Sequence, residues 1–203
     1  MGKRLIALLL DKGHAVKALV RKGSENKLPK ACSYVTGDPF NASTFSNDIP
    51  EGTTFVQLLG VAHPGPSKKE QFRAIDLASV KASAEAAKHT YVQHFVYVSV
   101  AQMPTSIMHD FQQCRAEGEA VIRATQIPAT FIRSWYVVGP GHYWPLLFQP
   151  LFTILEWIPF TSQKAKALRL VTLKQMLHTL LYAIENMPAT GVNIIEIDSI
   201  RKM

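Results

Sequence analysis

Apolar and polar residues follow two different periods along the chain, and the changes of period predict its helices and strands. The first apolar run, Leu5–Leu10, is apolar on nearly every side, as in a helix buried on a sheet, and Gly13 follows where a helix can end in the left-handed conformation. Ala15–Val20 is then a short run rich in strand-forming residues. The chain is therefore predicted to open with a buried helix, a glycine stop and a strand.

The rest of the chain divides in the same way into short apolar runs and longer stretches with helical spacing. The predicted strands are 33–36, 53–59, 94–100, 129–133 and 192–197, and the predicted helices are 44–47, 70–88, 110–125 and 173–184. The clearest strand, His94–Val100, is of the type buried on both faces. Strands and helices alternate from residue 4 to 134, which predicts an α/β fold with a doubly wound parallel sheet.

Size and composition agree with one globular domain. The chain has 203 residues, of which 47% are apolar and 18% charged. Cys32 and Cys114 form no metal-binding or redox spacing, so we expect reduced thiols, no metal site and a cytoplasmic location. Asp76, on the predicted helix 70–88, is expected to be a solvated carboxylate.

The positive charge is concentrated at the start of the chain. Residues 1–30 hold eight Lys and Arg against Asp11 and Glu25, which leaves +6 of the total net charge of +7. A basic surface beside the carboxyl end of a strand suits an anionic ligand, and a solvated basic surface is the alternative. Aromatic residues are not interleaved with these charges, so nucleic acid is not an expected partner.

The first predicted helix and strand carry a residue pattern that is typical of a known protein family. Gly2, the leucines that follow, Gly13-His14 and Ala18-Leu-Val-Arg21 resemble the first α–β unit of the atypical short-chain dehydrogenases/reductases, the NmrA-like and NAD-dependent epimerase-like group. Segments 94–100 and 129–142 resemble later strands of the same family. The resemblance implies a Rossmann-like NAD(P)-binding core over 1–134 and a substrate-side segment over 135–203, packed on the same domain.

The sequence departs from this family at its beginning. In the family a strand and a G-x-x-G-x-x-G turn precede the first helix, and Gly2 matches only the last of those glycines. Two interpretations stay open, namely a truncated start and a protein that differs from the family at its cofactor-binding turn. Loss of the strand would leave its neighbours with unpaired backbone groups, which is a large cost.

The resemblance also implies where a cofactor would bind. An acidic residue after the second family strand would bind a ribose 2′-hydroxyl, whereas Arg21 suits a 2′-phosphate. We therefore expect NADP(H) rather than NAD(H), with Lys22 as a helper. The resemblance also implies that Asp38 lies near the adenine and that the loop 60–66 lines the cofactor. A plain turn at Asp38 and an ordinary surface loop at 60–66 are the alternatives. The expected cofactor-binding residues are Gly2, Arg21, Lys22, Asp38, Leu59, Gly60, Val61, Ser99 and Arg115.

The catalytic pattern of the family is altered. Its Tyr-x-x-x-Lys motif aligns with Phe111-Gln-Gln-Cys-Arg115, and phenylalanine has no hydroxyl to exchange a proton. The candidate catalytic residues are Ser99, which would polarise a substrate carbonyl, Arg115, which would hold a ribose hydroxyl, and His109, which can transfer protons near neutral pH. Tyr97 and Tyr143 are further candidates.

Three functions follow from these observations. The first is an NADP-dependent reductase or epimerase-type oxidoreductase acting on an unknown small carbonyl or hydroxyl substrate. The second is a non-catalytic NADP(H)-binding redox sensor or partner-binding module, and the third is a truncated family fragment.

The aromatic segment 143–160 is interrupted by prolines and Glu156, which favours a substrate-side segment over a membrane anchor, with a membrane-surface or dimer role left open. Neither the substrate nor the oligomeric state is predicted.

Overall fold

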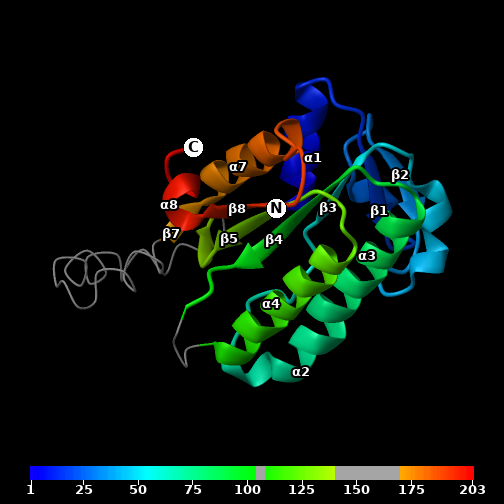
Figure 1. Cartoon of the computed structure of the whole chain (residues 1–203). Coiled ribbons are helices and arrows are strands. Elements are labelled where there is room, and N and C mark those ends of the chain that lie inside the picture. The colour runs from blue at the N-terminus through cyan, green and yellow to red at the C-terminus, as the bar shows by residue number, and fades with distance from the viewer. Residues whose placement is uncertain (104–107, 140–169) are drawn as a thin grey trace.

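The computed structural model describes residues 1–103, 108–139 and 170–203 (Figure 1). The longer helices of this part are α1 (Gly2–Asp11), α3 (Ala78–His89), α4 (His109–Ala124) and α7 (Leu173–Glu185), and the short ones are α2 (Lys69–Gln71) and α8 (Ile197–Ile200). The strands are β1 (Lys17–Val20), β2 (Ser33–Thr36), β3 (Thr54–Gln57), β4 (His94–Val100), β5 (Ala129–Ser134), β6 (Tyr136–Val138), β7 (Leu170–Thr172) and β8 (Val192–Glu196).

The main sheet is parallel and has the order β3-β4-β5-β8. The α1 and α7 helices pack on one face of it, where Leu5, Leu9 and Leu180 meet Val96 and Ile132. The α3 and α4 helices cover the other face (Figure 1). Helices on both faces of a parallel sheet confirm the predicted doubly wound α/β fold.

The central strand β4 is as apolar and buried as its sequence predicts. All of its residues except Val98 are buried, and it pairs with β3 on one side and β5 on the other. Burial on both faces is typical of parallel strands in this class of fold. Residues 170–203 add Met176, Leu180 and Ile195 to the same hydrophobic core as Val96 of β4.

Some boundaries differ from the prediction because local geometry departs from a regular helix. The predicted helix 44–47 is a pair of 3₁₀ turns, Ala42–Thr44 and Ser46–Asp48. The predicted helix 70–88 contains a π-helical stretch, Phe72–Leu77, between α2 and α3. Such stretches are rare and occur often at functional sites.

The parallel sheet is interrupted between β1 and β3. The β1–β2 pair forms its own two-stranded ladder, and no described strand joins it to the main sheet. Figure 1 shows β1 lying between β2 and β3. The interruption falls where the resembled family has the strand that finds no counterpart in this sequence.

No described helix is long and apolar enough to cross a membrane. The predicted substrate-side segment 143–160, with Tyr143, lies outside the described residues.

Candidate functional site

The residues expected at the cofactor site follow three parallel strands. Arg21 and Lys22 come directly after β1, Asp38 comes shortly after β2, and the segment 59–61 comes shortly after β3. The carboxyl ends of parallel strands in open α/β sheets are where ligands bind. The side chains of Arg21, Lys22 and Asp38 are exposed, so they are accessible from solvent.

The amino end of α1 lies at the same edge. A Cβ atom added to Gly2 would lie 3.8 Å from Cδ1 of Leu58, just beyond β3. No side chain caps this helix end, and no acidic residue stands in its first turn. The first N–H groups of a helix have no acceptor within it, and together with the helix dipole they attract anions. This set of donors fits a phosphate-bearing cofactor.

Asp38 takes part in a local turn. Its Oδ1 accepts a hydrogen bond from the Phe40 N–H at 3.0 Å, and its own N–H donates to Oγ1 of Thr44 at 2.9 Å. These two hydrogen bonds are typical of a plain turn, which is the alternative that the sequence leaves open at Asp38. A contact between Asp38 and an adenine stays a prediction.

A buried ion pair stands behind the loop that follows β3. Nη2 of Arg115, on α4, lies 2.5 Å from Oδ1 of Asp76, which belongs to the π-helical stretch. Asp76 is 0% exposed, so the expectation of a solvated carboxylate was wrong. Burial raises the pKa of Asp76, and the adjacent guanidinium opposes that shift. Burial alone would lower the pKa of Arg115, but Tyr97 and Asp76 together hold it above its ordinary value.

Arg115 is held by several further contacts within the protein. Its Nη1 donates to the Val98 carbonyl at 3.0 Å and to the Tyr97 hydroxyl at 3.3 Å. Its guanidinium also lies over the ring of Phe111, with 5.3 Å from Cζ to the ring centroid. Only 8% of Arg115 is exposed. A contact between this residue and a ribose hydroxyl stays a prediction, and it would require part of the guanidinium to become accessible.

The ion pair fixes the conformation of the loop after β3. Oδ2 of Asp76 accepts a hydrogen bond from the Val61 N–H at 2.9 Å. A Cβ atom at Gly60 would collide with Nη2 of Arg115 and lie 3.0 Å from Oδ1 of Asp76. A side chain at position 60 would therefore have to displace the guanidinium of Arg115. The structure thus brings Gly60, Val61 and Arg115 together.

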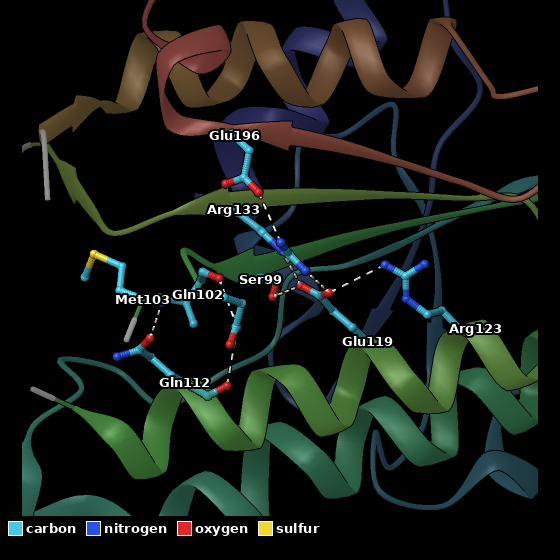
Figure 2. Close-up of polar contacts among 9 residues, drawn as sticks. Ser99, Gln102, Met103, Gln112, Glu119, Arg123, Arg133 and Glu196 are labelled. Carbon is cyan, nitrogen blue, oxygen red and sulfur yellow. Dashed lines mark hydrogen bonds and ion pairs between the residues drawn. The ribbon is translucent and has the colours of Figure 1, made fainter. Parts of the chain in front are cut away.

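Ser99 belongs to a second polar network, shown in Figure 2. Its hydroxyl donates to Oε1 of Glu119 on α4 at 2.7 Å, and Arg133 on β5 donates to both carboxylate oxygens of Glu119 at 2.9 and 2.6 Å. Arg133 also donates to Oε1 of Glu196 at 3.1 Å. Ser99, Arg133 and Glu196 are register partners on the adjacent strands β4, β5 and β8. Ser99 is 5% exposed, so its role toward a substrate or cofactor stays a prediction.

The segment after β4 is anchored on α4. Oε1 of Gln112 accepts a hydrogen bond from the Met103 N–H at 2.7 Å, and Nε2 of Gln102 donates to the Gln112 carbonyl at 3.4 Å (Figure 2). His109 is the exposed first residue of α4, so it is accessible for the predicted proton transfer. Tyr97, in contrast to His109, is almost fully buried, with 1% of its surface exposed. Burial raises the pKa of its hydroxyl.

The sequence did not single out Glu119, Arg133 and Glu196. Glu119 lies on the same helix as the exposed His109 and Arg123, and its burial depends on the position of Arg133 on another element. Within the described residues no cluster of His, Cys, Asp and Glu has the geometry of a metal site.

The fold and this edge of the sheet define a dinucleotide-binding protein of the α/β class. A sequence profile described as NAD(P)H-binding matches residues 1–141, and the chain belongs to this family. The resemblance to the NAD(P)-binding Rossmann group of atypical short-chain dehydrogenases/reductases is thereby confirmed. Comparison with curated proteins gave no match.

Solved structures with the same fold include enzymes in complex with NAD. The Bordetella bronchiseptica enzyme WbmH in complex with NAD+ is 15% identical, with a TM-score of 0.68 over 97% of this chain and 71% of that chain. UDP-glucuronic acid 4-epimerase from Bacillus cereus in complex with NAD is also 15% identical, with a TM-score of 0.66 over 97% of this chain and 74% of that chain. At these identities the likeness shows the fold.

Proposed function

We propose that this protein binds NADP(H) at the carboxyl edge of the sheet and acts as an oxidoreductase on a small carbonyl or hydroxyl substrate. The observation that carries the proposal is the uncapped amino end of α1, which lies beside Leu58 at the end of β3 and has no acidic residue in its first turn. A pyrophosphate there accepts hydrogen bonds from backbone N–H groups and gains from the helix dipole.

The preference for NADP(H) rests on Arg21 and Lys22. Both are exposed directly after β1. A guanidinium pairs well with a phosphate through two parallel hydrogen bonds, whereas a ribose 2′-hydroxyl gains little from two positive charges. The similar solved structures named above carry NAD, so the preference has to be measured on this chain.

A bound nicotinamide supplies or accepts the hydride, and the chain has to supply the accompanying proton. Phe111 has no hydroxyl, and Arg115 remains protonated. His109, exposed at the start of α4, is the described residue best suited to exchange that proton with solvent. The hydroxyl proton of Ser99 is donated to Glu119, so Ser99 would have to turn away from Glu119 to donate to a substrate carbonyl.

A second function, non-catalytic NADP(H) binding as a sensor or partner-binding module, is favoured by the two buried carboxylates. Asp76 holds Arg115, and Glu119 holds Ser99. Both family-predicted active-site groups are therefore engaged within the protein. In this function the Asp76–Arg115 pair would keep the Gly60 loop in one conformation, and no proton transfer would be required.

Oxidation of NADPH with a panel of aldehydes and ketones separates the two functions. Turnover that falls at least tenfold in His109→Gln, with NADPH affinity unchanged, supports the oxidoreductase. His89→Gln is the matched control, because His89 is an exposed histidine at the end of α3. NADPH binding without turnover on any carbonyl compound supports the non-catalytic function.

A further inference from the structure

His63 has a backbone conformation that the neighbouring sequence does not favour. Its φ is +53°, in the left-handed region, and Pro64 follows it. Histidine enters this region more often than most residues do, but a proline favours an extended conformation in the residue before it. Residues in sparsely populated conformations cluster at active sites and ligand clamps, and they persist only where the surrounding structure holds them.

The other exposed non-glycine residues with positive φ in the described part of the chain have a local cause. Tyr91, with φ of +53°, is the second residue after α3, and Gln126, with φ of +63°, is the second residue after α4. A left-handed residue at this position is a common way for a helix to end. His63 follows no helix, because it lies in the loop between β3 and the 3₁₀ turn Pro66–Lys68.

Contacts with the rest of the protein hold the loop next to His63. The Val61 N–H donates to Oδ2 of Asp76 at 2.9 Å, and Nζ of Lys68 donates to the Ala62 carbonyl at 2.6 Å. The two residues before His63 are therefore each fixed by a charged side chain. A side chain that is held in place before a ligand arrives loses less conformational entropy on binding.

His63 belongs to the part of the sheet edge where the nicotinamide half of the cofactor is expected. Arg21, expected at the 2′-phosphate, follows β1, whereas His63 follows β3, which pairs with β4. Val61 packs on the same apolar cluster as Phe111, which aligns with the catalytic tyrosine of the family. The cluster consists of Phe72, Leu77 and Cys114.

The chemistry of the loop suits a phosphate. His63 is exposed, and an imidazole has at least one N–H donor in either protonation state. The segment from Leu59 to Lys68 contains no acidic residue, and the ammonium of Lys68 is bound next to His63, at the Ala62 carbonyl. This local excess of positive charge attracts an anion.

We propose that His63 binds the phosphate on the nicotinamide half of NADP(H) by donating an imidazole N–H to one of its oxygens. The proposal rests on the proposed function, because it concerns the same cofactor. The adenosine half, with Arg21 at its 2′-phosphate, would be bound without His63. Adenosine 2′,5′-bisphosphate, which lacks the nicotinamide half, should therefore bind independently of this residue.

Calorimetric titration of His63→Asn and His63→Gly with NADPH and with adenosine 2′,5′-bisphosphate tests the proposal. Both replacements tolerate a positive φ, and both remove the imidazole. We expect the affinity for NADPH to fall about threefold to thirtyfold in both variants, and the affinity for the bisphosphate to stay within about twofold. Gln126→Asn is the matched control, because Gln126 is also exposed and left-handed but precedes β5, at the opposite edge of the sheet. It should change neither affinity.

Unchanged NADPH affinity in both His63 variants, with the bisphosphate still bound, would overturn the proposal and leave the cofactor site in place. An equal loss of affinity for the two ligands would also overturn it, because the substitutions would then act on the whole site rather than on one phosphate. Absence of binding of either ligand by the unmodified chain would overturn the proposed function itself, and the titration of that chain therefore separates the two failures.

Discussion

Asp76 and Arg115 form a buried ion pair whose two side chains together hold the first residues after β3. One carboxylate oxygen of Asp76 contacts the guanidinium at 2.5 Å, and the other accepts the Val61 N–H. A Cβ atom at position 60 would collide with the guanidinium of Arg115 unless that side chain moved. The conformation of the predicted cofactor loop therefore depends on two residues that lie on helices far from it in sequence.

Loss of the Asp76 carboxylate should destabilise the folded protein. Asp76→Ala leaves a buried guanidinium without its counter-ion, and we expect a decrease in the free energy of unfolding of about 3–5 kcal/mol. Urea unfolding followed by circular dichroism measures it. The control is Glu117→Ala, which breaks the exposed pair with Arg73 and should cost at most about 1 kcal/mol. Equal costs for the two variants would contradict the burial of the first pair.

Glycine 60 offers an independent test of the same geometry. Gly60→Ala places a methyl group against the guanidinium of Arg115, and we expect destabilisation of about 1–3 kcal/mol. Gly65→Ala is the matched control, because an added Cβ there meets no atom within 4 Å. Thermal unfolding of both variants, compared with the parent chain, gives the answer. If the two variants unfolded at the same temperature, the close approach at Gly60 would be refuted.

Arg133 binds two carboxylates that should contribute unequally. Glu119 is buried and accepts two hydrogen bonds from Arg133 and one from Ser99, whereas Glu196 is exposed. We expect Glu119→Ala to lower the free energy of unfolding by about 3–5 kcal/mol and Glu196→Ala by at most about 1 kcal/mol. Chemical denaturation of both variants measures the difference. A larger cost for Glu196→Ala would contradict the network drawn in Figure 2.

His94 should make stability depend on pH. It is buried on β4, its Nε2 lies 3.0 Å from Oγ1 of Thr130, and burial lowers its pKa from 6.5 to about 4. The folded state therefore favours the neutral ring. The resulting stability is fully present above pH 6.5 and is lost as the pH falls from 6.5 to about 4, by about 3 kcal/mol in all.

Unfolding free energies measured across that pH range test the effect. His94→Gln should flatten this part of the pH profile, and the exposed His89→Gln should leave the profile unchanged. A profile that keeps its full slope in His94→Gln would show that another group is responsible.

Arg21 should set the choice between the two cofactors. Removal of a charge-assisted hydrogen bond to a 2′-phosphate costs about 1.5–3 kcal/mol, so Arg21→Ala should weaken NADPH binding by about tenfold to a hundredfold and leave NADH binding nearly unchanged. Lys27→Ala is the control, since Lys27 is an exposed cation on the turn Glu25–Lys27. Unchanged NADPH affinity in Arg21→Ala, measured by calorimetry, would end the argument for NADP(H).

The sequence predicted the parts of the molecule that depend on local pattern. The apolar run of His94–Val100 and the stop at Gly13 both occur where the pattern placed them. The sequence also indicated that a strand of the resembled family has no counterpart, and the sheet is interrupted at that place.

Burial of single charges could not be predicted in this way. Asp76 and Glu119 are both buried carboxylates, and only the approach of Arg115 and Arg133 from other elements makes their burial favourable. The π-helical stretch that holds Asp76 has no separate pattern in the sequence. For the same reason, the sequence did not indicate that Arg115 and Ser99 are each held by a carboxylate.

Calorimetric titration of the 203-residue chain with NADPH, and with NADH for comparison, measures directly whether this protein binds a nicotinamide dinucleotide. We expect saturable binding of NADPH in the micromolar range, with weaker binding of NADH. The absence of binding of either nucleotide, by a chain that circular dichroism shows to be folded, would contradict the assignment of a nicotinamide dinucleotide site to this edge of the sheet.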